Sequence, residues 1–585
     1  MKLSSLLFGI SGAAAVKEAS EKYVKLDFDK YYGVTFADAE KGKRVADVRL
    51  LKRADGFEEV QITNQNSFYS VTLEVGTPAQ KIVVLVDTGS SDLWVTGSDN
   101  PYCASSSSFL RKRDDDGTTT IAPSSMNSEV HNEGLWDWLT GGGRATRTST
   151  RSTPTATGSA GARATIDCSK YGTFDTSKSS TWSSNHTGFL IQYGDTTFAS
   201  GTWGQDQLHL SDLNVTGLSF AVANQTNSTV GVLGIGLPAL EVTYSGKNSA
   251  SGTKPYQYAN LPMVLVNSGA IHKNAYSLFL NNASAEYGSV LFGAVDHSKY
   301  SGSLVTVPMV NTYAASGFKN PIQFEITLSG LGITMDGTNT TITTTKIPAL
   351  LDSGTTLTYF PEAIVDSIMN TVGATYSRSV GYYTFDCPAN VNDFNIVFDF
   401  NGFQISASIS DFVIGTNGQN CILGILPQST GGAILGDSFL NSAYVVYDLD
   451  NYQISLGQAD YSGGSENIEV ISDSVPSAVS APDYSNTWST LATTFNAAGD
   501  IFTNTFDYTS QTGSASGSNS QATATSGSTS ASQTGSASTT RRSTSASATT
   551  TSSTSSRGED QKKNDATKMV SSSLFVLISF VFFLV

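Results

Sequence analysis

Two aspartates stand in copies of one motif. Asp87 follows an apolar run in VVLVDTGSSDLWV, residues 83–95, and Asp352 follows another in IPALLDSGTTLTYF, residues 347–360. A lone Asp-Thr-Gly is common where a strand ends, since Asp and Gly are ordinary turn residues. A second copy after a second apolar run indicates two related halves. Two carboxyls that meet cannot both ionise, so such a pair holds one proton and offers an acid and a base together.

A glycine-rich stretch follows each motif at a distance, GVLGIG at 231–236 after the first and AILGDSFL at 433–440 after the second. On these motifs the chain resembles the pepsin-like aspartic proteases over 68–458. The resemblance implies a mainly β, bilobal fold, in which two related β-rich lobes have the active-site cleft between them.

The same resemblance makes Asp87 and Asp352 a catalytic dyad on the cleft floor. One carboxyl would take a proton from a bound water as the water attacks the peptide carbonyl, while the other donates a proton to the carbonyl oxygen. The pair would titrate as a unit. We expect no cofactor besides this water, and no metal, because the five histidines show no metal-binding spacing.

Neighbours in both motifs would support the dyad. The glycine of each motif allows a tight turn that brings amides to the carboxylate. The hydroxyl of the residue after each glycine would donate a hydrogen bond to an outer carboxylate oxygen. The hydroxyl of the residue before each glycine would form hydrogen bonds with the other lobe. The second motif has serine where the family usually has threonine, which keeps the hydroxyl. The supporting residues are Thr88, Gly89, Ser90, Ser353, Gly354 and Thr355.

The segment GFLIQYGDTTFASG, residues 188–201, resembles the family's flap, a hairpin that closes over the substrate. Tyr193 would be its aromatic residue and reach towards Trp94 on the cleft wall, with Gly194 and Asp195 near the tip. Asp195 would pair with a Lys or Arg side chain of the substrate. The alternatives are a packed strand tyrosine and a solvated turn aspartate.

Three further features are an insertion over 104–167, a Ser- and Thr-rich stalk with its core at 509–556, and an apolar C-terminal tail, MVSSSLFVLISFVFFLV, that looks like an anchor signal. With these features the chain resembles the fungal yapsins, surface proteases that cleave at single or paired basic residues. The resemblance implies that this protein cuts protein precursors or cell-surface proteins at Lys or Arg. A broad hydrophobic preference is the alternative within the enzyme class. An inactive binding protein or wall glycoprotein is the alternative outside it. The leader would inhibit the zymogen, with Lys25 as a residue that could pair with the dyad.

The elements that must position these residues are mostly strands. From Phe68 to about residue 460, short β-branched or aromatic runs alternate with Gly, Asn, Asp and Ser turns. PEAIVDSIMNTVGA at 361–374 is the clearest helix. We expect a first lobe over 54–265 and a second over 266–462.

The N-terminal segment has the pattern of a secretory leader. Residues 1–15 combine a lysine, a short apolar run and small residues, which is typical of a signal peptide. Residues 16–53 carry ten Lys or Arg against seven Asp or Glu and would be a basic propeptide, which a kexin-like protease cuts after Arg53. The net charge of −16 argues against nucleic acid as a partner.

Residues 104–167 are rich in Ser, Thr, Gly and Arg and lie between two cysteines. We expect a surface insertion closed at its base by a disulfide of Cys103 with Cys168. Cleavage after Arg113 would turn a monomer into two disulfide-linked chains. In an oxidising compartment the cysteines can form two disulfides, and the sequence alone permits three pairings. The four are Cys103, Cys168, Cys387 and Cys421.

Sequons for N-glycosylation occur only in the middle of the chain, which fits a glycosylated secretory protein. The six asparagines are Asn185, Asn214, Asn224, Asn227, Asn282 and Asn339.

Residues 463–563 would form an O-glycosylated stalk, because the part from 509 to 556 is nearly pure Ser, Thr, Ala and Gly. The final MVSSSLFVLISFVFFLV is mostly apolar and follows a polar spacer. This favours a glycosylphosphatidylinositol signal over 564–585, removed on attachment at Asn564, with Gly558 as the alternative site. The protein would then be anchored at the plasma membrane or the cell wall. A permanent tail anchor is the other interpretation.

Overall fold

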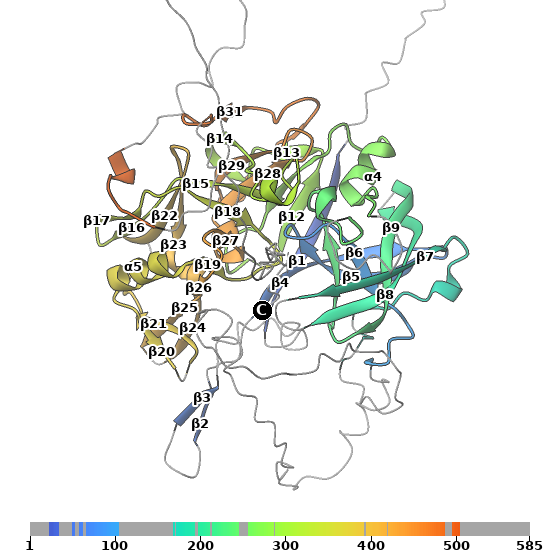
Figure 1. The fold of residues 1–585 in the computed structure, drawn as a ribbon, viewed down its shortest axis with the longest axis horizontal. Coiled ribbons are helices and arrows are strands. Elements are labelled where there is room, and N and C mark those ends of the chain that lie inside the picture. Colours follow the sequence, from blue (N-terminus) through green and yellow to red (C-terminus); the bar gives the residue numbers. More distant parts are fainter. Residues whose placement is uncertain are drawn as a thin grey trace, which may run out of the picture. The chain divides into compact units, whose positions relative to one another are not determined.

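The computed structural model describes residues 23–33, 49–52, 58–61, 66–103, 166, 168–169, 171–193, 197–210, 213–244, 255–285, 287–378, 380–390, 393–417, 419–485 and 494–503. These residues form strands joined by turns, with few and short helices (Figure 1). All of them belong to one compact unit.

The strands around the first motif lie in the order β4 (Asn66–Val75), β5 (Gln80–Asp87), β10 (Gly231–Gly234), β6 (Leu93–Thr96) and β9 (Leu213–Thr226). Strand β10 pairs in parallel with β5 and antiparallel with β6. It therefore lies between the strand that enters the motif loop and the strand that leaves it. Asp87 is the last residue of β5.

The second motif has the same arrangement, in the order β15 (Glu325–Leu328), β18 (Ile347–Leu351), β27 (Ala433–Leu435), β19 (Thr358–Pro361) and β26 (Ile425–Gln428). Strand β27 is parallel to β18 and antiparallel to β19. The glycine-rich stretches that follow the motifs supply β10 and β27. The prediction of a mainly β fold built from two related halves is confirmed.

The first arrangement belongs to a 14-stranded sheet. Its other strands are β1 (Val24–Gly33), β7 (Ser183–Gln192), β8 (Phe198–Leu210), β11 (Ala275–Phe279), β12 (Tyr287–Phe292), β14 (Tyr300–Pro308), β28 (Ala443–Asp448), β29 (Gln453–Ala459) and β31 (Ala478–Ser480). Smaller sheets contain β2 (Arg49–Lys52), β3 (Glu58–Gln61), β13 (Ala294–Asp296), β16 (Gly330–Met335), β17 (Thr338–Thr343), β20 (Thr375–Ser377), β21 (Tyr382–Asp386), β22 (Phe394–Phe400), β23 (Phe403–Ser408), β24 (Val413–Asn417), β25 (Asn420–Leu423) and β30 (Ile468–Val470). The helices are α4 (Leu261–Asn267), α5 (Glu362–Val372) and α6 (Asp437–Leu440).

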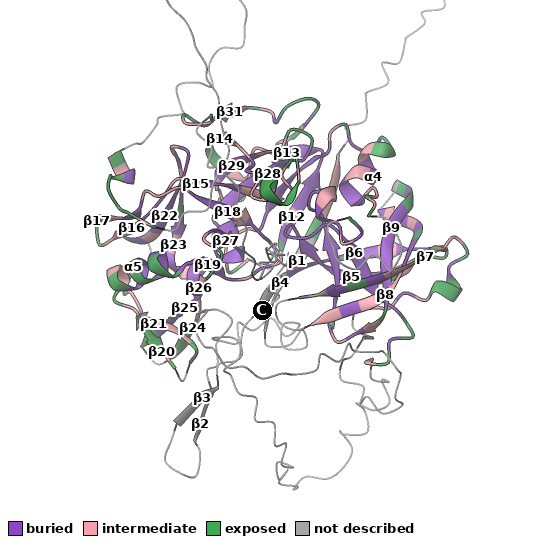
Figure 2. Cartoon of the chain, viewed as in Figure 1, coloured by how far each residue is buried: buried purple, intermediate pink, exposed green. Residues whose placement is uncertain are grey.

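Burial follows the apolar runs that precede the motifs. Four successive residues of β5, Val84 to Asp87, are buried, and β18 is buried along almost its whole length (Figure 2). A strand with a parallel neighbour and packed faces needs such a continuous run. The helix predicted over 361–374 is α5, which ends at Gly373 in the left-handed region, with φ of 71°. That helix prediction is confirmed.

The leader contributes a strand that the sequence reading left out. Strand β1 pairs with β12 on one side and with β4 on the other. The alternation of Val24, Leu26 and Phe28 with charged residues is the signal that could have predicted it. The suggested contact of Lys25 with the dyad is wrong. In the pairing of β1 with β12, Lys25 lies opposite Leu291. The ammonium of Lys25 forms ion pairs with Asp27, at 3.1 Å, and with Glu466.

The boundary of the predicted stalk at 463 is also corrected. Strand β30 pairs with β13, and β31 pairs in parallel with β14. Further on, Asn496 O accepts a hydrogen bond of 2.9 Å from Thr344 N, and Ile501 is buried beside Gly330. The folded body therefore continues to residue 503. Isolated apolar residues in a polar stretch anchor it, and average composition does not reveal them.

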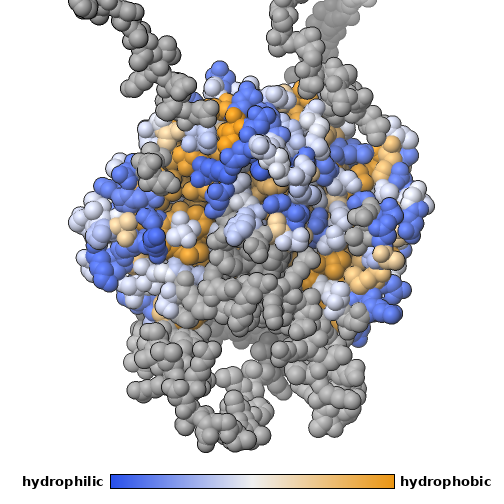
Figure 3. Space-filling view, turned by 180° about the vertical axis from the view of Figure 1, so that it is seen from behind, coloured by the Kyte–Doolittle hydropathy of each residue, from blue (hydrophilic) through white to orange (hydrophobic). Residues whose placement is uncertain are grey.

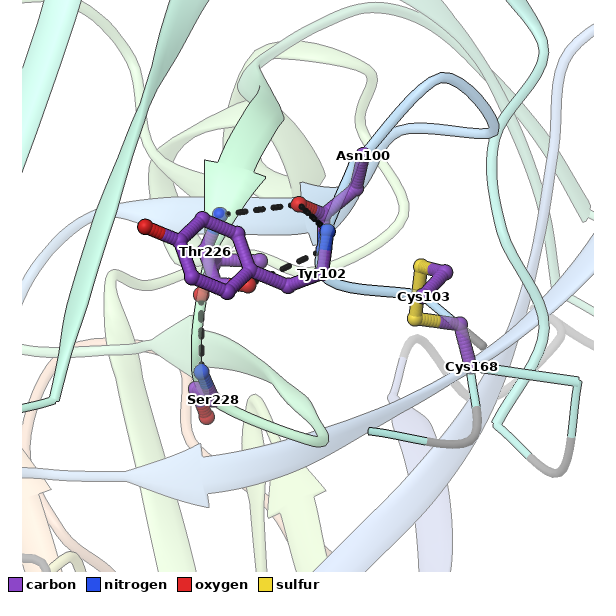
Figure 4. The surroundings of a disulfide bond; sticks show 6 residues. All are labelled: Asn100, Tyr102, Cys103, Cys168, Thr226 and Ser228. Carbon is purple, nitrogen blue, oxygen red and sulfur yellow. Dashed lines mark hydrogen bonds between the residues drawn. A yellow bond between two sulfur atoms is a disulfide. The ribbon is translucent and has the colours of Figure 1, made fainter. Parts of the chain in front are cut away.

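Two disulfides are present, as the four cysteines predict. Cys103 bonds to Cys168, at the base of the predicted insertion, and Cys387 bonds to Cys421. Beside the first bond, Asn100 Oδ1 accepts hydrogen bonds from Tyr102 N at 3.3 Å and Thr226 N at 3.2 Å (Figure 4). These contacts fix the chain just before Cys103. Residues 104–165 and 167 lie outside the described residues.

Candidate active site

Asp87 and Asp352 each accept two hydrogen bonds from their own loop. The amide of the motif glycine donates to one carboxylate oxygen, at 2.8 Å in the first loop and 2.9 Å in the second. The hydroxyl of the next residue donates to the other oxygen, at 2.7 Å in the second loop. The donors are Gly89, Ser90, Gly354 and Thr355. Both carboxyls are thus held in a fixed orientation by the arrangement that the motifs predict.

Thr88 and Ser353 join the two loops reciprocally. Thr88 N donates to Ser353 Oγ at 3.1 Å, and Ser353 N donates to Thr88 Oγ1 at 2.9 Å. Each hydroxyl then donates to a carbonyl of the opposite half, Thr88 to Leu351 at 3.0 Å and Ser353 to Val86 at 3.1 Å. Serine at position 353 can make the same hydrogen bonds as the threonine that the family usually has there, because they involve only the hydroxyl and the backbone amide.

The motif glycines leave room for the opposite carboxylate. A Cβ atom at Gly89 would collide with the side chain of Asp352, and one at Gly354 would collide with that of Asp87. The close approach of the two aspartates therefore requires glycine at both positions.

Burial and proximity couple the two acids. Burial raises the pKa of both carboxyls, and the charge of Asp352 raises the pKa of Asp87 further, well above its ordinary value. A side-chain hydrogen bond joins the pair. The two groups therefore keep one proton between them over a wide range of pH, and one of them can act as an acid while the other acts as a base.

Tyr193 and Trp94 meet beside the first loop. Trp94 Nε1 donates to Tyr193 Oη at 2.6 Å, and both side chains are buried. Tyr193 follows β7, which pairs with β8 as the predicted hairpin does. Gly194 and Asp195 lie outside the described residues, so the suggested contact of Asp195 with a basic substrate stays a prediction.

Two buried tyrosines that the motifs did not point to lie near the dyad. Tyr276 Oη donates to Ile235 O at 3.0 Å, and Ile235 N donates to Asp87 O at 2.9 Å. The ring centroids of Tyr447 and Tyr276 lie 5.0 Å apart. Burial is the main cause that raises the pKa of Tyr447, and the charge of Asp352 raises it further. In the sequence both look like ordinary core residues of strands, so no local signal marks them.

Other predicted features divide between described and undescribed residues. Arg53, Arg113 and Asn564 lie outside the described residues. Of the sequon asparagines, Asn185, Asn214, Asn224 and Asn339 are exposed, and Asn227 and Asn282 are half-buried. Their glycosylation stays a prediction.

The described part of the chain contains neither a cluster of metal-ligating side chains nor a membrane-spanning helix. No group of three or more His, Cys, Asp or Glu side chains there could hold a metal ion. No helix there is long and apolar enough to cross a bilayer. Seen from behind, the surface carries apolar patches between hydrophilic areas (Figure 3).

Comparison with known proteins agrees with this geometry. The family described as eukaryotic aspartyl protease matches residues 68–459, which include both motif loops and the hairpin. The chain belongs to this family. It is an aspartic endopeptidase of the yapsin type, as its relatives indicate.

Three relatives come from Saccharomyces cerevisiae. Aspartic proteinase 3 is 56% identical over 86% of this chain and 88% of its own length. Aspartic proteinase MKC7 is 53% identical over 81% of this chain and 79% of its own. Aspartic proteinase yapsin-3 is 46% identical over 84% of this chain and 83% of its own.

Proposed function

We propose that Asp87 and Asp352 are the catalytic dyad of this aspartyl protease. The observation that carries the proposal is the reciprocal arrangement of the two loops, in which each glycine makes room for the opposite carboxylate and each hydroxyl bonds across to the other half. Two buried acids that share one proton supply both the general base and the general acid that hydrolysis of a peptide bond by water requires.

The ionised carboxyl takes a proton from a water molecule, whose oxygen attacks the carbonyl carbon of the scissile peptide. The protonated carboxyl gives its proton to the carbonyl oxygen, which forms a tetrahedral diol. Collapse of the diol breaks the C–N bond as the amine receives a proton from the dyad. No cofactor other than water takes part. Since the step needs one proton on the pair, activity falls when rising pH removes it.

We further propose that the enzyme prefers Lys or Arg at the scissile bond. Support comes from the net charge of −16, which favours cationic substrates, and from the resemblance to the yapsins. A broad hydrophobic preference is the competing function, favoured by the apolar cluster that surrounds Tyr193 and Trp94.

Secretion and surface attachment complete the proposal. The signal peptide, the stalk and the anchor signal predicted from the sequence would place the enzyme on the plasma membrane or cell wall. A relative from Candida albicans, which is 35% identical over 80% of this chain, is named secreted aspartic protease 9, and this name supports secretion. The leader of this chain would restrain the zymogen until a kexin-like protease cuts after Arg53.

One experiment tests both the dyad and the preference. The full chain is processed to remove the leader, and kcat/KM is measured at mildly acidic pH on peptides that carry Lys, Arg, Leu or Phe at one position. Pepstatin and the Asp87→Asn variant serve as controls. Cleavage by that variant at the rate of the parent would overturn the dyad, and faster cleavage after Leu or Phe would overturn the basic preference.

A further inference from the structure

A second pair of acids is buried close to the dyad. Asp92 lies five residues after Asp87, in the same motif loop, and only 2% of its surface is exposed, while Glu241 is fully buried. The backbone of Asp92 is tied to the strand beside β5, since Gly234 N donates to Asp92 O at 3.0 Å. Neither acid takes part in the chemistry described above.

The hydrogen bonds of Asp92 join three separate segments. Asp92 Oδ2 accepts from Val242 N at 2.9 Å, and Asp92 Oδ1 accepts from Tyr258 Oη at 2.7 Å. Glu241 Oε2 accepts from Tyr258 N at 2.9 Å. Asp92 therefore joins the motif loop directly to Val242 and to Tyr258, and Glu241 joins the segment of Val242 to the same tyrosine.

The fastened segments support the hairpin. The ring of Tyr258 packs 5.0 Å from that of Trp203 in β8, and Trp203 packs 5.2 Å from Phe189 in β7. Tyr258 and Val242 border the apolar cluster that also contains Trp94 and Tyr193. A change at the acids would therefore reach the Trp94–Tyr193 contact through packed side chains.

We propose that Asp92 and Glu241 are positioning residues, which through Tyr258 hold residues 241–244 and 255–260 against the β7–β8 hairpin. In this way they set the upper pH limit at which the active site stays assembled. Both acids interact with each other and with Tyr258, and Tyr256 acts electrostatically on Tyr258. Asp92, Glu241, Tyr256 and Tyr258 therefore form one electrostatically linked cluster.

The direction of the pH effect follows from burial. Burial raises the pKa of Asp92 from 3.8 to about 6, although Val242 N and Tyr258 Oη oppose the shift. Burial, with the charge of Asp92, raises the pKa of Glu241 from 4.5 to about 10. An acid whose pKa is raised by folding stabilises the fold at low pH and loses that contribution as pH rises. The loss extends from about pH 4 to 6 for Asp92 and continues to about pH 10 for Glu241.

The test uses two substitutions with opposite expected signs. Glu241→Gln keeps an oxygen that can accept from Tyr258 N but removes one ionisable group, so the midpoint of inactivation at high pH should rise by about one unit, and the half-life at pH 8 should lengthen about tenfold. Tyr258→Phe keeps the ring on Trp203 but removes a donor to ionised Asp92, so the midpoint should fall. The full chain, processed, is incubated at each pH, and residual activity is read at pH 4.5.

Asp206→Asn is the matched control, because Asp206 is a buried acid of the same half that accepts from Ser179 Oγ at 2.6 Å and Thr181 Oγ1 at 2.5 Å. It should leave the midpoint where it is or lower it. Hydrogen exchange gives a local readout. Peptides that cover 188–203 and 237–244 should lose protection in the parent at a lower pH than peptides of 433–448, and Glu241→Gln should remove this difference.

Equal midpoints for the parent and Glu241→Gln would overturn the proposal, as would an upward shift in Tyr258→Phe. Simultaneous loss of protection in all peptides of the parent would show ordinary global unfolding and would also overturn it. None of these outcomes depends on substrate preference, so the inference can fail while the proposed function stands.

Discussion

The two motif loops share the part that holds the dyad and differ in the part that follows it. Five residues after Asp87 stands the buried acid Asp92, whereas five residues after Asp352 stands Leu357, a buried apolar residue. The equivalent of Trp94 is Tyr359 in the second loop. The shared residues serve chemistry that needs symmetry, and the differing residues connect each loop to its own half.

The largest effect is expected where the loops are equivalent. Asp87→Asn and Asp352→Asn should each lower kcat/KM by about 10³-fold or more, because either change removes one of the two groups that share the proton. Peptide hydrolysis by the two processed variants measures it. One variant that keeps a tenth of the parent activity would break the equivalence.

Each half contains one disulfide, so removing the two bonds separately compares how much each contributes to the free energy of unfolding. The Cys103–Cys168 bond spans 65 residues and the Cys387–Cys421 bond spans 34. In the chain-entropy picture the loss of either, by paired Cys→Ser changes, should lower the free energy of unfolding by about 4 kcal/mol, with little difference between them. Denaturant unfolding of the uncleaved Asp87→Asn protein is the measurement. A disparity of several kcal/mol would show that one bond does more than close a loop.

The reciprocal hydroxyls give a smaller, paired effect. Thr88→Ala should leave Ser353 N without its acceptor, and Ser353→Ala should do the same to Thr88 N, at a cost of about 1–3 kcal/mol each. Thr88→Ser and Ser353→Thr keep the hydroxyls and should stay close to the parent. Thermal unfolding of the four variants is the measurement, and clearly unequal alanine effects would contradict the reciprocity.

The smallest effect is expected at the positions where the two loops differ, Trp94 in the first loop and Tyr359 in the second. Trp94→Phe and Tyr193→Phe each remove the 2.6 Å hydrogen bond, so a double-mutant cycle on kcat/KM should give a coupling of about 1 kcal/mol. Tyr359→Phe combined with Tyr193→Phe should be additive. Coupling of Tyr359 with Tyr193 as strong as that of Trp94 would remove the distinction between the loops.

Sequence reasoning reached the features with a local signature. Two motif copies, each followed by a glycine-rich stretch, sufficed to predict the two related halves, and the apolar periodicity of 361–374 sufficed to predict helix α5. The pairing of β1, the partner of Lys25 and the folded extent beyond 463 depend on contacts between distant segments, which no local pattern encodes. Asp92 was visible in the motif, but its burial beside Glu241 depends on a turn 150 residues further on.

Strand β1 has a consequence for how the enzyme can be made. Among the strands that the structure describes, β1 is the one that joins β12 to β4 in the 14-stranded sheet, and it belongs to the segment that the proposed processing would discard. The mature protease would then lack a strand that was present while its sheet formed. The segment that helps to form this sheet would therefore differ from the segment that remains in the working enzyme, so the lifetime of the processed form should be measured as a rate of unfolding as well as an equilibrium free energy.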